Sequence, residues 1–378
     1  MHKGSNEKLV VSNGIILPNK NPEEVPPDGD GKTSFFYNDS DFVKHYTLND
    51  GSESKFDRAF QHSWDAAKQK GLFRYNLDQM KTRILPGQFG FVAQLNKGRA
   101  TLRRKPQEMM SVSQPFDPYK FNFTKVKPGE VCSFVLMELC HETDGKLQKD
   151  KKHMIIINVS PLEYCSVLLV PNIDDCLPQV LTKEAVQVGI EMTLLSAKRS
   201  LLVGWNSLCA SASVNHLHFH AYHLDYPLRI QTEPTSQLSG PCHEILSWPV
   251  PGFVFQLNGN DVKDLASNLY AVAKYFHQKE VAHNVCLTRG TVLGSKEHSS
   301  EATLRGIIWP RSSVFGVKDV DAFNVAFSEL AGHLPLMDEQ LFSDLTDQSA
   351  VEALQGARLP HETFQSLRTG IQKLFVQD

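Results

Sequence analysis

Three histidines separated by single apolar residues stand in the middle of the chain, within residues 214–224, a stretch with the composition of a β-strand. The histidines are His216, His218 and His220, and the residues that follow them in turn are Leu217, Phe219 and Ala221. Because side chains alternate between the faces of a strand, the three imidazoles are predicted to share one face at about 6–7 Å spacing. A neutral imidazole nitrogen can attack phosphorus, expel a phosphate leaving group and hold the nucleotidyl group as a phosphoramidate.

Two other interpretations of this row stay open. Neutral imidazole is a common zinc ligand, and positions i and i+2 of a strand can share one ion. No neighbouring carboxylate or cysteine completes a ligand set, so we expect no metal and no other cofactor. A purely structural role is disfavoured, because burying three ionisable rings on one face is costly.

Basic side chains upstream of the row are candidates for binding phosphate. The densest basic patch contains Arg99, Arg103, Arg104 and Lys105. Arginine offers a planar fork that matches phosphate oxygens, although a solvated charged surface explains the patch equally well. Lys125 follows an aromatic stretch and suits neutralisation of a substrate, with ordinary burial of its aliphatic stem as the alternative.

Two polar residues are candidates for the same site, and one further histidine is not. Asn206 and Ser207 end a predicted strand, where an amide or hydroxyl can bond the α-phosphate or fix an imidazole tautomer, and a turn is the alternative. His333 follows a helix-like segment and Gly332, so a cation at a helix C-terminus explains it without catalysis. We assign His333 no catalytic role.

The elements that must position these residues mix helices and strands in an α+β fold. Apolar spacing predicts helices over residues 54–71, 184–199 and 261–279. Strands are predicted over residues 131–139, 153–159, 164–170 and 201–208, with further strands after residue 251. We therefore expect a flexible segment at 1–34, a catalytic domain at 35–226 and a second α/β domain at 227–378.

Composition narrows the class of protein. The 378 residues are 41% hydrophobic, enough for a large core, and the net charge of -3 gives no general attraction to nucleic acid or anionic lipid. Neither a secretory signal nor a run of about 20 apolar residues is evident, so we expect no membrane association. The seven scattered cysteines form no C-x-x-C pair and indicate reduced thiols in the cytoplasm.

The segment from His216 to Tyr222 resembles the motif of the histidine-triad superfamily of nucleotide hydrolases and nucleotidyl transferases. Four further stretches are similar to the GDP-D-glucose phosphorylases of animals and their relatives, the GDP-L-galactose phosphorylases of plants: residues 96–99, 121–126, 158–164 and 321–326. The resemblance implies an antiparallel sheet with packed helices, in two related α/β units as in galactose-1-phosphate uridylyltransferases.

The same resemblance implies a reaction. His218 would be the nucleophile that carries GMP, with His216 and His220 supporting it, while inorganic phosphate converts GDP-glucose into GDP and glucose 1-phosphate. Cys165 and Ser166 stand where the family has Gly-His, which puts any contact made there by histidine in question. The alternatives are a histidine-triad hydrolase, a GDP-L-galactose phosphorylase, a metal-dependent enzyme and a non-catalytic guanine-nucleotide binder.

Overall fold

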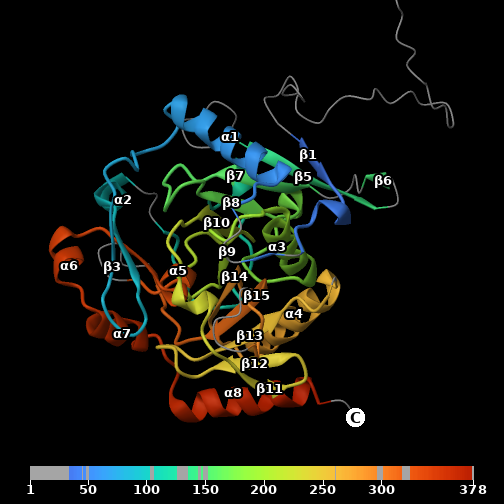
Figure 1. Cartoon of the computed structure of the whole chain (residues 1–378), viewed down its shortest axis with the longest axis vertical. Coiled ribbons are helices and arrows are strands. Elements are labelled where there is room, and N and C mark those ends of the chain that lie inside the picture. The colour runs from blue at the N-terminus through green and yellow to red at the C-terminus, as the bar shows by residue number, and fades with distance from the viewer. Residues whose placement is uncertain are drawn as a thin grey trace, which may run out of the picture.

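A computed structural model describes residues 34–44, 46–47, 51–102, 106–125, 135–143, 146–147, 152–259, 261–295, 301–316 and 324–376. The segment 1–34, which we expected to be flexible, lies outside these ranges except for Ser34. Within the described residues, 13 strands form one sheet and three form a second, smaller sheet. Figure 1 shows helices packed around both.

The large sheet is antiparallel except where β1 runs parallel to β5. In spatial order its main path is β1 (Ser34–Tyr37), β5 (Val135–Thr143), β7 (His153–Ile157), β8 (Val167–Val170), β10 (Phe219–His223), β9 (Leu201–Asn206), β14 (His283–Thr291), β15 (Glu301–Pro310), β13 (Gly252–Gln256), β12 (Cys242–Ile245) and β11 (Ser236–Ser239). Two short strands extend it, β2 (Tyr46–Thr47) beside β15 and β6 (Lys146–Leu147) beside β5. The predicted α+β class with an antiparallel sheet is confirmed.

The two halves of this sheet repeat one connectivity. The first half follows the chain order β7, β8, α3 (Lys183–Leu195), β9 and β10, and the second half follows β12, β13, α4 (Val262–Gln278), β14 and β15. In both halves the fourth strand lies between the second and the third. Antiparallel pairing of β9 with β14 joins the halves, and α3 packs against α4. The two related units that we expected are therefore present.

The small sheet ties the halves together a second time. It contains β3 (Lys81–Ile84), β4 (Val92–Leu95) and β16 (His333–Leu336), and β16 from the second half runs parallel to β4 from the first. Both sheets therefore contain strands from both halves of the chain. The expected division into two domains between residues 226 and 227 stays a prediction.

The helices form where the sequence supplies caps and apolar stripes. α1 (Lys55–Gln69) begins at a capping box made by Ser54 and Asp57, and buries Phe56, Phe60 and Trp64. The other helices are α2 (Lys97–Leu102), α5 (Phe327–Ala331), α6 (Glu339–Asp344), α7 (Asp347–Gln355) and α8 (His361–Leu374). No helix in the described part of the chain is long and apolar enough to cross a membrane.

Alternation along β10 divides the core between the two faces of the sheet. Phe219 and Ala221 point into the hydrophobic cluster beneath α1, α3 and α4. Tyr222 points the other way, into a second cluster with Phe327 of α5 and Leu334 of the small sheet. His220 shares the face of Tyr222, so the site lies on the face opposite α3 and α4.

Candidate active site

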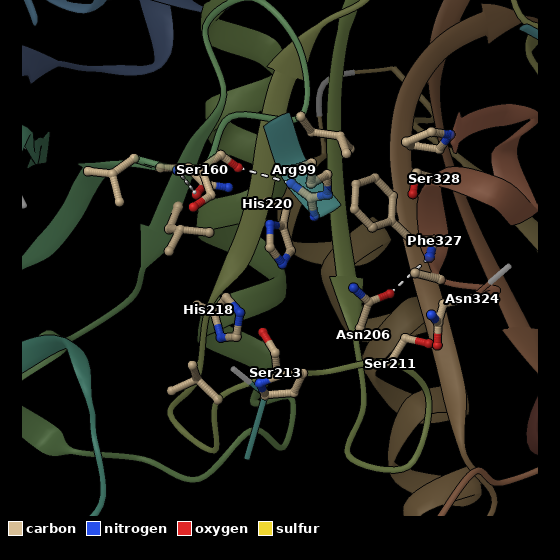
Figure 2. Close-up of a pocket in the computed structure, with 18 of the residues that line it drawn as sticks. Arg99, Ser160, Asn206, Ser211, Ser213, His218, His220, Asn324, Phe327 and Ser328 are labelled. Atoms are coloured by element: carbon tan, nitrogen blue, oxygen red, sulfur yellow. Dashed lines mark hydrogen bonds between the residues drawn. The ribbon is translucent and has the colours of Figure 1, made fainter. Parts of the chain in front are cut away.

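A cavity of about 190 Å³ opens beside the start of β10. Both halves of the chain line it, because residues 156–160, His218 and His220 come from the first half and residues 324 and 326–329 come from the second. Figure 2 shows the two histidines on one side of the cavity, with Asn206 and Asn324 facing them. Of the three motif histidines, the cavity lining contains His218 and His220.

The prediction of one continuous strand through all three histidines is wrong. β10 begins at Phe219, and the preceding residues bond to the loop before α3, since the Leu217 amide donates to the Leu177 carbonyl. His216 therefore lies behind His218 and outside the cavity lining. Its ring stacks on Phe123 at 5.3 Å, and its Nδ1 accepts a hydrogen bond of 3.0 Å from the Phe123 amide.

His218 has the protonation and orientation that a nucleophile needs. Its Nδ1 lies 2.7 Å from the His216 carbonyl oxygen and 3.0 Å from Oε1 of Gln179, both of which accept hydrogen bonds. The proton of the neutral ring must therefore be on Nδ1, which leaves the lone pair on Nε2. Burial lowers the pKa of His218 to about 4, with the bond to His216 opposing the shift, so the ring is neutral near pH 7.

His216 is neutral for the same reason. Burial, together with the neighbouring His218, lowers its pKa to about 4. Since Nδ1 accepts from Phe123, the proton of the His216 ring is on Nε2. The His216 carbonyl oxygen accepts a hydrogen bond from His218, and the His216 ring packs behind His218.

His220 is held between His218 and an aromatic ring. It lies edge-on to His218 at 5.2 Å between ring centroids and stacks on Phe327 at 6.0 Å. Phe327 fits there because its neighbour in β9 is Gly204, where a Cβ atom would come within 1.9 Å of the phenylalanine ring. Because Gly204 has no side chain, the Phe327 ring can lie against β9 and line the cavity beside His220.

Asn206 presents a hydrogen-bond donor to the cavity. Its Oδ1 accepts from Nδ2 of Asn284 at 2.6 Å and from the Phe327 amide at 2.9 Å, which fixes the orientation of the side-chain amide. The Nδ2 group then points toward the histidines, as Figure 2 shows. An amide donor fixed in advance at this place can bond an oxygen of a phosphate attacked by His218.

Two arginines of the first half also line the cavity. Arg99, in α2, is half-buried and donates from Nη1 to the Ser160 carbonyl at 3.0 Å. Arg74, which sequence reasoning missed, donates from Nη1 to the Leu102 carbonyl at 2.9 Å. Each guanidinium carries further donors that suit an anionic substrate.

Two further residues that were predicted to bind phosphate, Ser207 and Lys125, lie outside the cavity lining. Ser207 is buried, donates to the Leu208 carbonyl and accepts from the His283 amide, and it is not part of the cavity lining. Lys125 is exposed, and its ammonium donates to the Lys120 carbonyl at 2.8 Å outside the lining. Arg103, with Arg104 and Lys105, lies outside the described residues.

The expected cation at His333 is wrong. The side chain is fully buried, and burial lowers its pKa to about 3, with the charge of Arg99 acting in the same direction. Its Nδ1 lies 2.9 Å from the Tyr222 hydroxyl and its Nε2 lies 2.6 Å from Oε1 of Gln94. His333 is a neutral link between β10 and β4.

The departure at Cys165 and Ser166 has a structural explanation. Cys165 adopts φ 56°, the left-handed conformation that glycine takes most easily. The Ser166 hydroxyl accepts from the Leu162 amide at 3.1 Å and closes the turn. The Ser166 side chain therefore has a local structural role in this turn.

Gln179 was also missed, because a single glutamine in a loop carries no pattern. Phe327 was not predicted either, although the stretch that resembles the family ends just before it, at residue 326.

Among the described residues, no group of three histidine, cysteine, aspartate or glutamate side chains is arranged to hold a metal ion.

Known proteins are similar to this chain over most of its length. Two family models match the chain, "GDPGP1-like, N-terminal domain" over residues 55–222 and "GDPGP1-like, C-terminal domain" over residues 230–377. The chain is 42% identical to GDP-D-glucose phosphorylase 1 of Danio rerio over 347 residues, which cover 90% of this chain and 98% of that protein. The chain belongs to the GDP-D-glucose phosphorylase family.

Other members and relatives of the family extend the comparison. GDP-D-glucose phosphorylase 1 of Homo sapiens is 44% identical over 334 residues, which cover 86% of this chain and 85% of that protein. GDP-L-galactose phosphorylase 1 of Arabidopsis thaliana is 31% identical over 323 residues, which cover 80% of this chain and 70% of that protein. The crystal structure of yeast Ap4A phosphorylase Apa2 with Ap4A has a TM-score of 0.54 at 14% identity, covering 81% of this chain and 99% of that one, and shows the shared fold.

Proposed function

We propose that this chain catalyses phosphorolysis of GDP-D-glucose by inorganic phosphate, giving GDP and glucose 1-phosphate. The observation that carries the proposal is the neutral His218 ring, whose proton is held on Nδ1 and whose Nε2 is left for attack beside the cavity. Membership of the family and the activity named for its members support the choice of substrate.

The reaction proceeds in two displacements. Nε2 of His218 attacks the α-phosphorus, a nitrogen–phosphorus bond forms, and the bond to the bridging oxygen breaks so that glucose 1-phosphate leaves with the electron pair. An oxygen of inorganic phosphate then attacks the same phosphorus, the bond to nitrogen breaks, and GDP leaves. The imidazole is neutral again at the end of the cycle.

The residues around the cavity supply the donors for both steps. Asn206 Nδ2 and the Arg99 guanidinium are our candidates for the oxygens that gain charge in each transition state. The positive charge on the His218 ring is stabilised at Nδ1 by the His216 carbonyl. His220 lies next to the nucleophile, where it can contact the phosphates.

The cytoplasm is the compartment that we propose for this reaction. Five cysteines in the described ranges are free thiols, which suits a reducing environment. They are Cys165, Cys176, Cys209, Cys242 and Cys286.

Steady-state kinetics with separate quantification of GDP, GMP and glucose 1-phosphate test the proposal. We expect turnover of GDP-glucose to depend on phosphate, with equal amounts of GDP and glucose 1-phosphate and parallel lines in a two-substrate plot. GMP formed at a rate independent of phosphate would indicate a hydrolase instead, and intersecting lines would contradict the covalent intermediate. Faster turnover of GDP-L-galactose would assign the other hexose.

A further inference from the structure

Gln179 lies directly behind the nucleophile, in the loop that leads into α3. Its side chain is 1% exposed, and its backbone amide donates to Oδ1 of Asn215 at 2.9 Å. The carboxamide contacts His218 three times. Its Oε1 accepts from the His218 amide at 2.8 Å and lies 3.0 Å from Nδ1, while its Nε2 donates to the His218 carbonyl at 3.0 Å.

The same carboxamide also bridges the two central strands of the first half. In the register of β9 and β10, His220 pairs with Gly204, so continuing the ladder by two residues would place His218 opposite Asn206. Nε2 of Gln179 donates to the Asn206 carbonyl at 2.9 Å as well as to His218. The carboxamide thus makes the hydrogen bonds that a backbone peptide group would make between the strands. It connects His218 with Asn206, the proposed hydrogen-bond donor to the phosphate.

The partners settle which end of the carboxamide is oxygen. Nε2 faces two carbonyl oxygens, which only accept, and Oε1 faces the His218 amide, which only donates. The reverse orientation would leave buried polar groups unpaired, which is costly. Oε1 is therefore a fixed neutral acceptor beside Nδ1 of His218.

We propose that Gln179 is a positioning residue for the nucleophile. Its carboxamide holds the His218 ring with the proton on Nδ1 and the Nε2 lone pair toward the cavity, and it helps to stabilise the charge that the ring acquires when the nitrogen–phosphorus bond forms. This role rests on the proposed function of His218 as the group that carries GMP. It requires a neutral acceptor, because a carboxylate at the same place would favour the imidazolium, which cannot attack phosphorus.

The ionisable groups near the nucleophile come from its own segment and from other parts of the cavity wall. They are His216, His220, Arg74, Arg99 and Glu329. The Glu329 carboxylate is engaged by the Ala326 amide and the Ser328 hydroxyl. A carboxylate introduced at position 179 would be the acidic group that lies against Nδ1 itself.

The pH dependence of a single turnover tests the role. The rate of glucose 1-phosphate release from GDP-glucose, without phosphate, is measured for the wild type, Gln179→Glu and Gln179→Met. We expect the wild-type rate to stay level as the pH falls to about 5, because the pKa of His218 is about 4. In Gln179→Glu the carboxylate should raise that pKa by about 1–3 units, so the rate falls at a higher pH than in the wild type.

Gln179→Met keeps the volume of the side chain and removes its hydrogen bonds. We expect a rate lower by about 10- to 100-fold at every pH, with the affinity for GDP-glucose within about threefold of the wild type. Gln231→Met is the matched control, since Gln231 is equally buried and its carboxamide contacts Thr288 and Arg199 away from the cavity. This control should lower the melting temperature and leave the rate of release unchanged.

Nitrogen-15 NMR of the imidazoles in the substrate-free wild type gives a test that needs neither a variant nor a known substrate. We expect the His218 signals of a neutral ring with the proton on Nδ1 down to about pH 5. A proton on Nε2, or titration near pH 6.5, would overturn the role of Gln179 while leaving phosphorolysis itself untouched. Coinciding pH profiles of Gln179→Glu and the wild type would overturn it too.

Discussion

Replacement of Gly204 by alanine should slow the reaction, although Gly204 is not part of the cavity lining. Gly204 lies in β9, and a Cβ atom there would meet the Phe327 ring at 1.9 Å. Carbon atoms in contact are normally at least about 3.5 Å apart, so the ring must move by about 1.6 Å. Phe327 stacks on His220, and its amide holds Oδ1 of Asn206, so both groups lose their support.

The magnitude has two parts. Inserting a methyl group into a packed core costs about 1–3 kcal/mol, which lowers the melting temperature by a few degrees. A displacement of about 1 Å in a group that positions the reaction costs about 100-fold in rate. We therefore expect Gly204→Ala to fold, to melt slightly earlier and to release glucose 1-phosphate about 100-fold more slowly in a single turnover.

Gly306→Ala provides the matched control. A Cβ atom at Gly306 would meet the Leu269 side chain at 2.4 Å, which is also overpacking, but in the core beneath α4. Its cost should appear in the melting temperature alone. A Gly204→Ala enzyme that reacts at the wild-type rate would refute the argument that Phe327 positions His220 and Asn206.

Three further predictions concern binding, chemistry and stability. Arg99→Ala should lower kcat/KM for phosphate about 10- to 100-fold in initial-rate assays, because it removes a donor to the charged transition state, whereas Lys125→Ala, outside the cavity lining, should match the wild type. Equal effects of the two substitutions would contradict a role for Arg99 in the site. Asn206→Asp should slow the single turnover by about 100- to 1000-fold, because a carboxylate oxygen replaces the donor that faces the phosphate, and a smaller loss than in Asn206→Ala would argue against that contact. Burial lowers the pKa of His283 in the folded protein to about 4, whereas the unfolded chain keeps a value of about 6.5. As the pH drops from about 6.5 toward 4, His283 is protonated in the unfolded chain but not in the folded one, so the free energy of unfolding falls. In urea titrations, the decrease in the free energy of unfolding between about pH 7.5 and pH 5 should be about 2 kcal/mol smaller in His283→Phe than in the wild type. An equal decrease in the two proteins would contradict the lowered pKa of His283.

Much of the fold could be predicted from local patterns. The apolar spacing in residues 54–71 predicted α1 because the same residues, among them Phe60 and Trp64, face the core. The row of alternating histidines predicted a strand too far toward its N-terminus, because Gln179 and Leu177 take the hydrogen bonds of His218 and Leu217 that a neighbouring strand would take. Such long-range replacements leave no trace in local periodicity.

The residues of the site, like the fold, could be predicted from the sequence only in part. The alternating spacing of the histidines pointed to His218, and the resemblance implied its role. Asn206 could be named because it ends a strand close to the motif and because the resemblance favours it. Arg74 and Phe327 reach the cavity only through the packing of distant segments, and a charge or an aromatic ring alone does not reveal that. Lys125 and Ser207 were predicted on residue type and local context alone, and the structure places both outside the cavity lining.

A covalent intermediate on His218 can be detected by the intact mass of the protein. The protein is mixed with GDP-glucose in the absence of phosphate and quenched in alkali to protect a phosphoramidate. We predict a GMP-sized adduct on the wild type, none on His218→Asn, and discharge of the adduct as GDP when phosphate is added. An adduct that persists in His218→Asn, or no adduct from a protein that still turns over GDP-glucose, would contradict the covalent GMP–His218 intermediate.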